Sequence, residues 1–381
     1  MDFSLTTEQH ELTQAAADFA RRELNQDLAK RDEAGEFPAE LWRACAKFGI
    51  LGLPMPAEYG GGGSDLITTA LVMEALGYGC QDNGLLFSLN AQLWSVQHPI
   101  VIFGTPQQQQ AYLPGMVAGD IIGGHAMTEP GSGSDALHLH TRAERRGENY
   151  LLNGTKQFIT NAPVADVLLV YASVDGGAGF GGLSAFLVDA KTPGLAVSSG
   201  LEKMGLRTSP IGEIALTDCL VPATSRLGPD GAGMAIFNSS MEWERSCLFA
   251  SWVGAMRRQL DACVAYARMR EQFGQPIGKF QAVAAKLADM YVSVEAARLL
   301  IYRVAWCKQQ GRSAPAEAAA AKLFTSEAWV RSSLDAIQTH GAVGYMKETG
   351  IERDLRDAVA STIYSGTSEI QRVLIARMLG L

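Results

Sequence analysis

The chain opens with a helical repeat of hydrophobic and polar positions that extends from Thr6 to about Gly119. Clusters of Gly and Pro interrupt this repeat at 52–65 and at 103–110. Because such clusters end helices, the region predicts roughly five or six separate helices. A second helical region extends from about Gly231 to Leu381. Its helices are expected to break at 273–278, 310–315, 340–345 and 364–368.

Between the two helical regions, the pattern changes to short runs of β-branched and apolar residues separated by Gly-containing turns. The runs are YLLNGTKQFITN, ADVLLVYASV, GLSAFLVDA, GLAVSSGLEKMGL and GEIALTDCLVP. The glycine run at 176–182 predicts a β-hairpin loop or a flexible tip. Helices, strands and helices in this order indicate an α+β fold, with helical domains at 1–120 and 231–381 flanking a β domain at 121–230.

One acidic residue interrupts an apolar row of the second helical region. The row consists of Phe237, Met241, Leu248 and Trp252. Glu244 falls on the same face, whereas Glu242 points elsewhere and is expected to be a solvated helix charge. Apolar surroundings disfavour the charged form, so the pKa of Glu244 should rise toward the range of a general base. The alternative is a structural Glu244 paired with Arg245 or with a distant cation.

Composition excludes several classes of function. The 40 acidic residues outnumber the 32 Lys and Arg, and this net charge of −8 argues against nucleic acid as a partner. The six cysteines form no CxxC pair and no His/Cys cluster, so we expect reduced thiols and no metal site. No run approaches the roughly 20 apolar residues that span a bilayer, and the N-terminus lacks the pattern of a signal peptide. We therefore expect a cytoplasmic protein with no membrane partner.

Several motifs resemble those of the acyl-CoA dehydrogenase flavoprotein family, in the family's order and across the whole chain. They are HAMTEPGSGSD at 125–135, KQFITN at 156–161, MREQFGQPIGKFQAV at 269–283, QTHGAVGY at 338–345 and IYSGTSEIQR at 363–372. The resemblance implies two helical domains around a β domain, the last one a four-helix bundle. It also implies a non-covalent FAD, a homotetramer, and α,β-dehydrogenation of an acyl thioester.

The resemblance further implies which residues hold the FAD. Those expected along the flavin ring are Met127, Thr128, Ser134, Phe158 and Thr160. Those expected to reach the FAD of a neighbouring subunit, or to complete its pocket, are Arg270, Gln272, Phe273, Gln338, Gly341 and Thr367. Many family members have Trp where this chain has Phe158, which bears on how electrons leave the flavin.

The chain departs from the family at the usual position of the base. Common members carry a Glu directly before the Gly-Thr of the last motif, but here that position is Ser365, which cannot act as a base at neutral pH. A minority carries the base on the helix in which Glu directly precedes Arg, and Glu244, directly before Arg245 in ERSCLFA, matches that position. The resemblance thus implies Glu244 as the catalytic base. Ser365, with Gly366 and Arg245, is placed at the substrate oxygen, where Ser365 needs only its backbone N–H.

Within the family, the chain looks closest to dehydrogenases of carrier-protein thioesters, in particular L-prolyl carrier-protein dehydrogenases. The implied partner is an acyl or peptidyl carrier protein with a phosphopantetheine thioester, and the electron acceptor is an electron-transfer flavoprotein or O2. Alternatives are a short-chain or branched-chain acyl-CoA dehydrogenase and a hydroxymalonyl or aminomalonyl carrier-protein dehydrogenase. A nucleic-acid-binding or scaffolding relative would need a basic extension, which this sequence lacks.

Overall fold

The computed structural model describes residues 4–174 and 181–381, so most of the loop predicted at 176–182 lies outside the described residues. The first helical region contains α1 (Thr7–Glu23), α2 (Leu28–Ala34), α3 (Ala39–Phe48), α4 (Leu66–Gly79), α5 (Asn83–Gln92), α6 (His98–Phe103) and α7 (Pro106–Ala118). Five or six helices were expected here, and the structure has seven. The difference arises because α2 has 7 residues and α6 has 6, too few for a helical repeat to be recognised.

The β region forms one sheet with the strand order β6-β7-β3-β2-β4-β5-β8, and β1 pairs with β4. The strands are β1 (Gly123–Ala126), β2 (Arg142–Arg146), β3 (Asn149–Thr160), β4 (Val167–Val174), β5 (Leu183–Asp189), β6 (Leu195–Val197), β7 (Ile211–Pro222) and β8 (Arg226–Leu227). All five predicted runs contain a strand. β1, β2 and β8 were not predicted, because they are short and carry small or charged residues rather than an apolar run.

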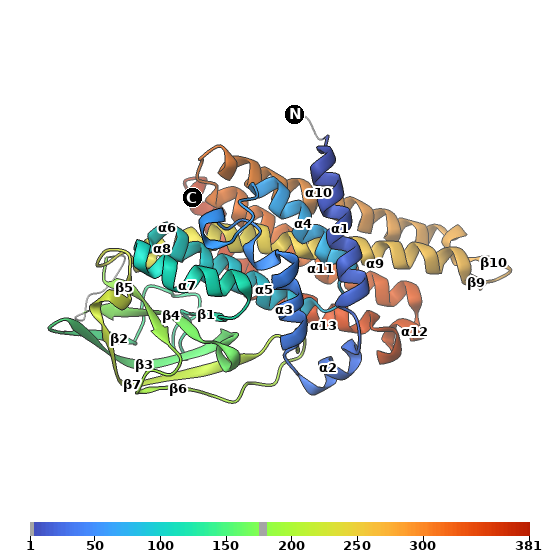
Figure 1. Ribbon diagram of the computed structural model, residues 1–381. Helices are drawn as coiled ribbons and strands as arrows, with labels where there is room; N and C mark the ends of the chain where they lie inside the picture. The colour runs from blue at the N-terminus through green and yellow to red at the C-terminus, as the bar shows by residue number, and fades with distance from the viewer. Residues whose placement is uncertain (1–3, 175–180) are drawn as a thin grey trace.

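The second helical region contains α8 (Gly233–Trp243), α9 (Phe249–Met269), α10 (Gln281–Gln309), α11 (Pro315–His340), α12 (Ala342–Tyr345), α13 (Ile351–Ser361) and α14 (Ser368–Met378). Three of the four predicted breaks separate long helices as expected, and the segment at 340–345 forms the short α12. The strands β9 (Glu271–Gln272) and β10 (Gln275–Pro276) make a hairpin that projects from the end of the bundle, far from the large sheet (Figure 1).

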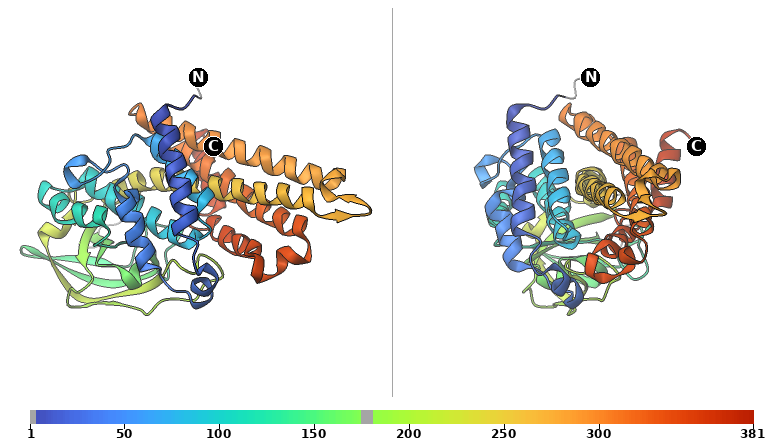
Figure 2. Two further views of the ribbon diagram at one scale, coloured as in Figure 1. Left: turned by 45° about the vertical axis from the view of Figure 1, so that its right-hand side comes forward. Right: turned by 90° about the vertical axis from the view of Figure 1, so that its right-hand side faces the viewer.

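Two apolar layers meet at the central strand β4. Leu169 and Tyr171 face α6, α7 and α8, whereas Leu168 and Val170 face a second core made with β3, β5 and β7. This arrangement follows from the alternation of side chains along a strand, and it explains why β4 is apolar at nearly every position. Figure 2 shows the sheet on one side of the first helices and the long C-terminal helices on the other. The predicted α+β order of helices, strands and helices is therefore confirmed.

Asp357 of α13 connects three parts of the chain. Its Oδ2 accepts a hydrogen bond from Asn83 Nδ2 of α5 at 2.9 Å, and its Oδ1 accepts one from the backbone N–H of Leu206 at 2.5 Å. Leu206 belongs to the loop between β6 and β7. Burial raises the pKa of Asp357 to about 7 although both donors oppose the rise. This one carboxyl group thus fixes the sheet between the two helical regions.

A buried ion pair stabilises the edge of the sheet near β1. Lys156 Nζ of β3 lies 2.9 Å from Glu129 Oε1 and donates to the carbonyl oxygen of Met127 at 3.1 Å. Glu129 also accepts hydrogen bonds from the backbone N–H groups of His140 and Thr141. Burial lowers the pKa of Lys156 to about 8, while Glu129 opposes this shift. Burial alone would raise the pKa of Glu129, but Lys156 and the neighbouring donors lower it overall.

Replacing Glu129 should therefore destabilise the fold. Glu129→Ala leaves the Lys156 charge without a partner in the interior, and we expect the free energy of unfolding to fall by about 3–5 kcal/mol in urea denaturation. The control is Glu144→Ala, since Glu144 pairs with Arg146 on the exposed face of β2. That change should cost less than about 1 kcal/mol. Similar losses in the two variants would contradict a structural role for the buried pair.

Candidate functional site

Two π-helical turns face each other where the first helices meet the C-terminal ones. Leu93–Gln97 joins α5 to α6, and Glu244–Leu248 joins α8 to α9. The indole rings of Trp94 and Trp243 stack between them, with centroids 5.8 Å apart and planes inclined by 7°. A π-helical turn inserts an extra residue into a helix and redirects the side chains around it. Such turns are frequent at functional sites, so this contact is a candidate site.

The carboxylate of Glu244 lies between two hydroxyl groups at this contact. Ser95 Oγ donates a hydrogen bond to Oε2, and Ser365 Oγ donates one to Oε1. Arg245 does not form the ion pair with Glu244 that was considered from the sequence; its Nε donates instead to the carbonyl oxygen of Ser365 at 3.0 Å. Each carboxylate oxygen therefore has one hydroxyl donor, and the carboxylate is held in a defined orientation.

Environment sets the proton affinity of this carboxylate. Burial raises the pKa of Glu244, and the hydroxyls of Ser365 and Ser95 and the charge of Arg245 only partly offset the rise. The direction agrees with the expectation from the apolar row. Glu242, in contrast, is not the solvated charge that the sequence suggested. Its Oε2 lies 2.7 Å from Lys308 Nζ at the end of α10 and accepts a hydrogen bond from the N–H of Ala314, just before α11, because the connection between these helices covers this face of α8.

The turn before α14 presents Ser365 to Glu244. Ser365 has φ 55° and Gly366 has φ 88°, both in the left-handed region that is unfavourable for a residue with a side chain. Gln371 Nε2 donates to the carbonyl oxygens of Ser365 and Gly366, and Thr367 caps the first turn of α14 by accepting from the N–H of Ile370. These bonds hold the strained turn in place. The role predicted for Ser365 used only its backbone, whereas the structure adds a contact of its hydroxyl with the carboxylate.

A second group of predicted residues meets at the edge of the sheet. The N–H of Gln157 donates to the carbonyl oxygen of Thr128 at 2.8 Å, and this bond places Met127 and Thr128 beside Phe158 and Thr160. Phe158 has φ 59° at a register shift between β3 and β7, and it is 56% exposed. The bulge turns a large apolar ring outward. Such a ring on an otherwise polar edge is suited to cover a flat ligand.

The loop that follows β1 leaves this edge open. Ser134 is exposed, and a side chain built at Gly133 would meet no atom within 4 Å. The accessible backbone and the nearby Thr128 hydroxyl are groups that can bind a polar ring edge. The residues present at the sheet edge therefore fit an aromatic cofactor with polar atoms along one side.

The remaining predicted residues lie at the far end of the bundle. Phe273, at the tip of the β9–β10 hairpin, is 93% exposed with φ 51°, and Arg270 and Gln272 accompany it. Gln338 and Gly341 are close to this end, because the His340 ring lies 4.3 Å from Tyr266 near the end of α9. Within one chain this group does not meet the sheet edge, as Figure 1 makes plain.

Sequence reasoning did not single out Ser95 or Gln371. Ser95 belongs to no motif, but it lies in a continuous stretch, 83–100, in which nearly every residue is buried. A hydroxyl in such a stretch requires a hydrogen-bond partner, and this requirement is the signal that was available. Gln371 had no such signal, since its role depends on the conformation of the turn before it.

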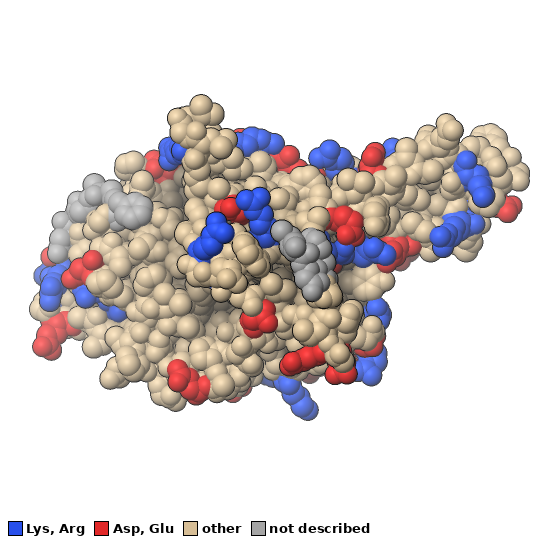
Figure 3. All heavy atoms as spheres, turned by 90° about the horizontal axis from the view of Figure 1, so that it is seen from above, with Lys and Arg blue, Asp and Glu red and all other residues tan. Residues whose placement is uncertain are grey.

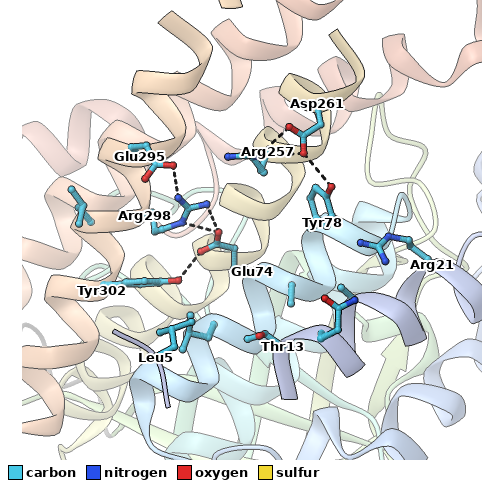
Figure 4. Close-up of a pocket in the computed structure, with 15 residues that line it drawn as sticks. Leu5, Thr13, Arg21, Glu74, Tyr78, Arg257, Asp261, Glu295, Arg298 and Tyr302 are labelled. Atoms are coloured by element: carbon cyan, nitrogen blue, oxygen red, sulfur yellow. Dashed lines mark hydrogen bonds and ion pairs between the residues drawn. The ribbon is translucent and has the colours of Figure 1, made fainter. Parts of the chain in front are cut away.

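A separate groove of about 680 Å³ lies between α1, α4, α9 and α10 (Figure 4). Glu74 occupies its centre and accepts hydrogen bonds from Arg298 at 2.7 Å and from Tyr302 at 2.9 Å. Arg257 and Asp261 pair with each other on its wall. Because these charges are satisfied by one another, the groove offers no free polar group comparable to the Glu244 site, and Glu244 does not line it.

Comparison with known families identifies the fold. The family models for the acyl-CoA dehydrogenase N-terminal, middle and C-terminal domains match residues 6–120, 124–219 and 231–380. The chain belongs to the acyl-CoA dehydrogenase family. This acyl-CoA dehydrogenase family member thus has the predicted fold class, a β domain between two helical domains, and the resemblance drawn from its motifs is confirmed.

Similar proteins of the family include carrier-protein enzymes. The L-prolyl-[peptidyl-carrier protein] dehydrogenase of Serratia sp. (strain ATCC 39006) is 42% identical over 381 residues, which cover 100% of this chain and 99% of that protein. The crystal structure of the prolyl acyl carrier protein oxidase AnaB is 47% identical with a TM-score of 0.98, covering 99% of this chain and 100% of AnaB. The structure of PigA with FAD and proline is 42% identical with a TM-score of 0.98, and both chains are covered completely.

The surface of this family member carries both signs of charge. Figure 3 shows Lys and Arg interspersed with Asp and Glu on the face seen from above. Among the described residues, no helix is long and apolar enough to cross a membrane, and no group of His, Cys, Asp and Glu has the arrangement of a metal site.

Proposed function

We propose that this chain is an FAD-dependent dehydrogenase of an acyl thioester, most specifically of a prolyl group carried on an acyl or peptidyl carrier protein, with Glu244 as the base that removes the α-proton. The observation that supports this most directly is the part-buried Glu244 carboxylate, which accepts hydrogen bonds from Ser95 and Ser365. The similarity to the Serratia dehydrogenase, AnaB and PigA supports the choice of a prolyl thioester.

The environment of Glu244 suits proton removal from a weak carbon acid. The α-hydrogen of a thioester is only weakly acidic, so its removal requires a base with a raised pKa and a fixed position. Burial raises the pKa of Glu244, and the two serine hydroxyls fix its orientation. We propose that the Ser365 N–H, beside Gly366 and Arg245, stabilises the negative charge that develops on the thioester oxygen.

Residues at the sheet edge fit the flavin. In this proposal Met127, Thr128, Ser134, Phe158 and Thr160 would hold the ring, and a bound FAD would supply the two-electron acceptor for the β-hydrogen, which leaves as a hydride. Loss of the α-proton to Glu244 and of the β-hydride leaves a carbon–carbon double bond. For a prolyl group, one such oxidation gives a pyrroline and a second gives a pyrrole. The electron acceptor, an electron-transfer flavoprotein or O2, and a cytoplasmic location stay predictions.

Assembly completes the proposed cofactor site. Arg270, Gln272 and Phe273 project away from the sheet edge of their own chain, so we propose that they, with Gln338, Gly341 and Thr367, serve an FAD shared between subunits of a homotetramer. The exposure of Phe273 supports this role, because its ring contacts Phe280 at an edge and is otherwise 93% exposed at a hairpin tip in the monomer. The matched regions also support domain boundaries at 1–120, 121–230 and 231–381.

The first prediction for this function concerns the base. Glu244→Gln should retain FAD and lose turnover of a prolyl-loaded carrier protein by roughly 10²–10⁴-fold, measured by mass spectrometry of the carrier. Glu242→Gln is the matched control, since this carboxylate is two residues away but pairs with Lys308, and it should stay near the wild-type rate. Undiminished turnover in Glu244→Gln would place the base elsewhere. Activity on free acyl-CoA esters alone would instead support the acyl-CoA alternative.

The second prediction concerns the two hydroxyl donors. Ser95→Ala and Ser365→Ala each remove a donor to the Glu244 carboxylate, which disfavours its charged form and raises its pKa. Because a base works only when deprotonated, the acidic limb of the kcat/KM profile should move to higher pH. The lost hydrogen bond should also lower kcat/KM at neutral pH about fivefold, equivalent to about 1 kcal/mol.

Ser240→Ala is the control for the hydroxyl donors. Ser240 lies one turn before Glu244, but its hydroxyl donates to the carbonyl oxygen of Phe237 and does not touch the carboxylate. Its pH profile should therefore match that of the wild type. An unchanged acidic limb in both the Ser95 and Ser365 variants would show that the serines do not tune the base.

The third prediction concerns the hairpin tip. Phe273→Asp should weaken FAD binding roughly thirtyfold and reduce the tetramer population, because losing an aromatic anchor at an interface costs about 2 kcal/mol. FAD content by absorbance and mass by light scattering measure the two effects. Leu220→Asp, at another exposed apolar position on β7, is the control and should leave both quantities unchanged. Full FAD content in a Phe273→Asp monomer would exclude a shared site.

A further inference from the structure

Two buried polar atoms near the candidate site have no hydrogen-bond partner among the residues that the structure describes. They are the hydroxyl of Tyr171 on β4 and Nε2 of His125 on β1. The two rings are in contact, with centroids 5.0 Å apart, yet the two atoms do not bond to each other. Buried polar groups are almost always paired, and an unpaired one costs about 1–3 kcal/mol. Two such atoms on rings that contact each other point to a bound ligand.

The pair lies next to the base. β1 packs against the π-helical turn that carries Ser95, and α8 leads directly into Glu244. The ring of Phe237 on α8 packs near both residues, with its centroid 5.9 Å from that of His125 and 6.1 Å from that of Tyr171. Burial and then the Glu244 carboxylate raise the pKa of the Tyr171 phenol. The Glu244 carboxylate takes its hydrogen bonds from Ser95 and Ser365, and the Tyr171 hydroxyl does not donate to it.

Both groups are neutral near neutral pH. Burial, with a smaller effect of Lys156, lowers the pKa of His125 to about 3, so its imidazole is uncharged, and the Tyr171 phenol keeps its proton. A phenol can donate and accept, and a neutral imidazole nitrogen accepts or donates according to its tautomer. Such a pair matches a ligand atom that both accepts and donates a hydrogen bond. A neutral secondary amine has this property, whereas a plain alkyl chain would leave both protein atoms unpaired.

We propose that the Tyr171 hydroxyl and His125 Nε2 bind the ring nitrogen of a carried cyclic aminoacyl group and thereby select it over plain acyl chains. This inference rests on the function proposed above. It assigns the choice of acyl group to two residues of the β domain, whereas proton removal belongs to Glu244. A site built to hydrogen-bond a polar substrate atom rejects the analogue that lacks this atom, because its own buried groups are then left unpaired.

The test compares two acyl groups on the same carrier protein, prolyl and cyclopentanecarbonyl, which differ at the ring nitrogen. Wild-type enzyme should prefer the prolyl group. Tyr171→Phe and His125→Phe should each lower kcat/KM for the prolyl group by about tenfold and leave that for the cyclopentanecarbonyl group unchanged or higher. The control is Tyr150→Phe, which removes a tyrosine hydroxyl that bonds to Asp230 on the other face of the sheet. It should change neither substrate's rate selectively.

Two results would overturn the inference. Equal losses of kcat/KM on both substrates in the Tyr171 and His125 variants would indicate a structural role only. An unchanged kcat/KM for the prolyl group would show that these two residues do not bind it. A wild-type enzyme without activity on the prolyl carrier would overturn the proposed function itself, and this outcome is distinct from the other two. Thermal unfolding of Tyr171→Phe provides a second readout, since removal of an unpaired buried hydroxyl should not lower the Tm of the free enzyme.

Discussion

The Glu244 carboxylate is the constraint around which the site is built. A carboxylate removed from water is costly unless donors replace the lost hydration. Its donors come from distant parts of the chain: Ser95 from the first helices and Ser365 from the turn before α14. The carboxylate can therefore be stabilised only when both helical regions are packed together. The donors replace the lost hydration only in part, and the pKa of Glu244 is therefore raised.

Irregular backbone makes this geometry available. Regular helices would present Ser95 and Glu244 with the spacing of an uninterrupted repeat, but each residue lies in a π-helical turn. Ser365 adopts a left-handed conformation, and its carbonyl oxygen accepts hydrogen bonds from Arg245 and Gln371. Strained backbone of this kind persists where the surrounding structure over-determines it, and it concentrates at functional sites. The three irregularities converge on one carboxylate.

The helical regions and the sheet contribute different groups to the site. The helical regions supply the carboxylate and its donors, while the sheet supplies the exposed Phe158 edge and the unpaired Tyr171 and His125 atoms. Asp357 fixes the sheet against both helical regions through Asn83 and Leu206. A carboxylate, an exposed aromatic ring and a pair of unpaired polar atoms are thus held in one arrangement on separate elements.

The sequence by itself determined the order of helices and strands, since long periodic runs and turn residues are local signals. It also determined that an acid lies in an apolar helix face at Glu244, because helical spacing is a local pattern. It did not determine the partners of that acid. Ser95 and Ser365 lie 149 and 121 residues from Glu244.

Contacts between residues so far apart produce no repeating pattern in the sequence. π-Helical turns produce no such pattern either. The same holds for the contact between His125 and Tyr171, which only the parallel pairing of β1 with β4 creates. Local patterns fix which elements form, whereas the pairing of side chains depends on how the elements pack. Tertiary structure therefore decided how the acid is held and which polar atoms stay unpaired beside it.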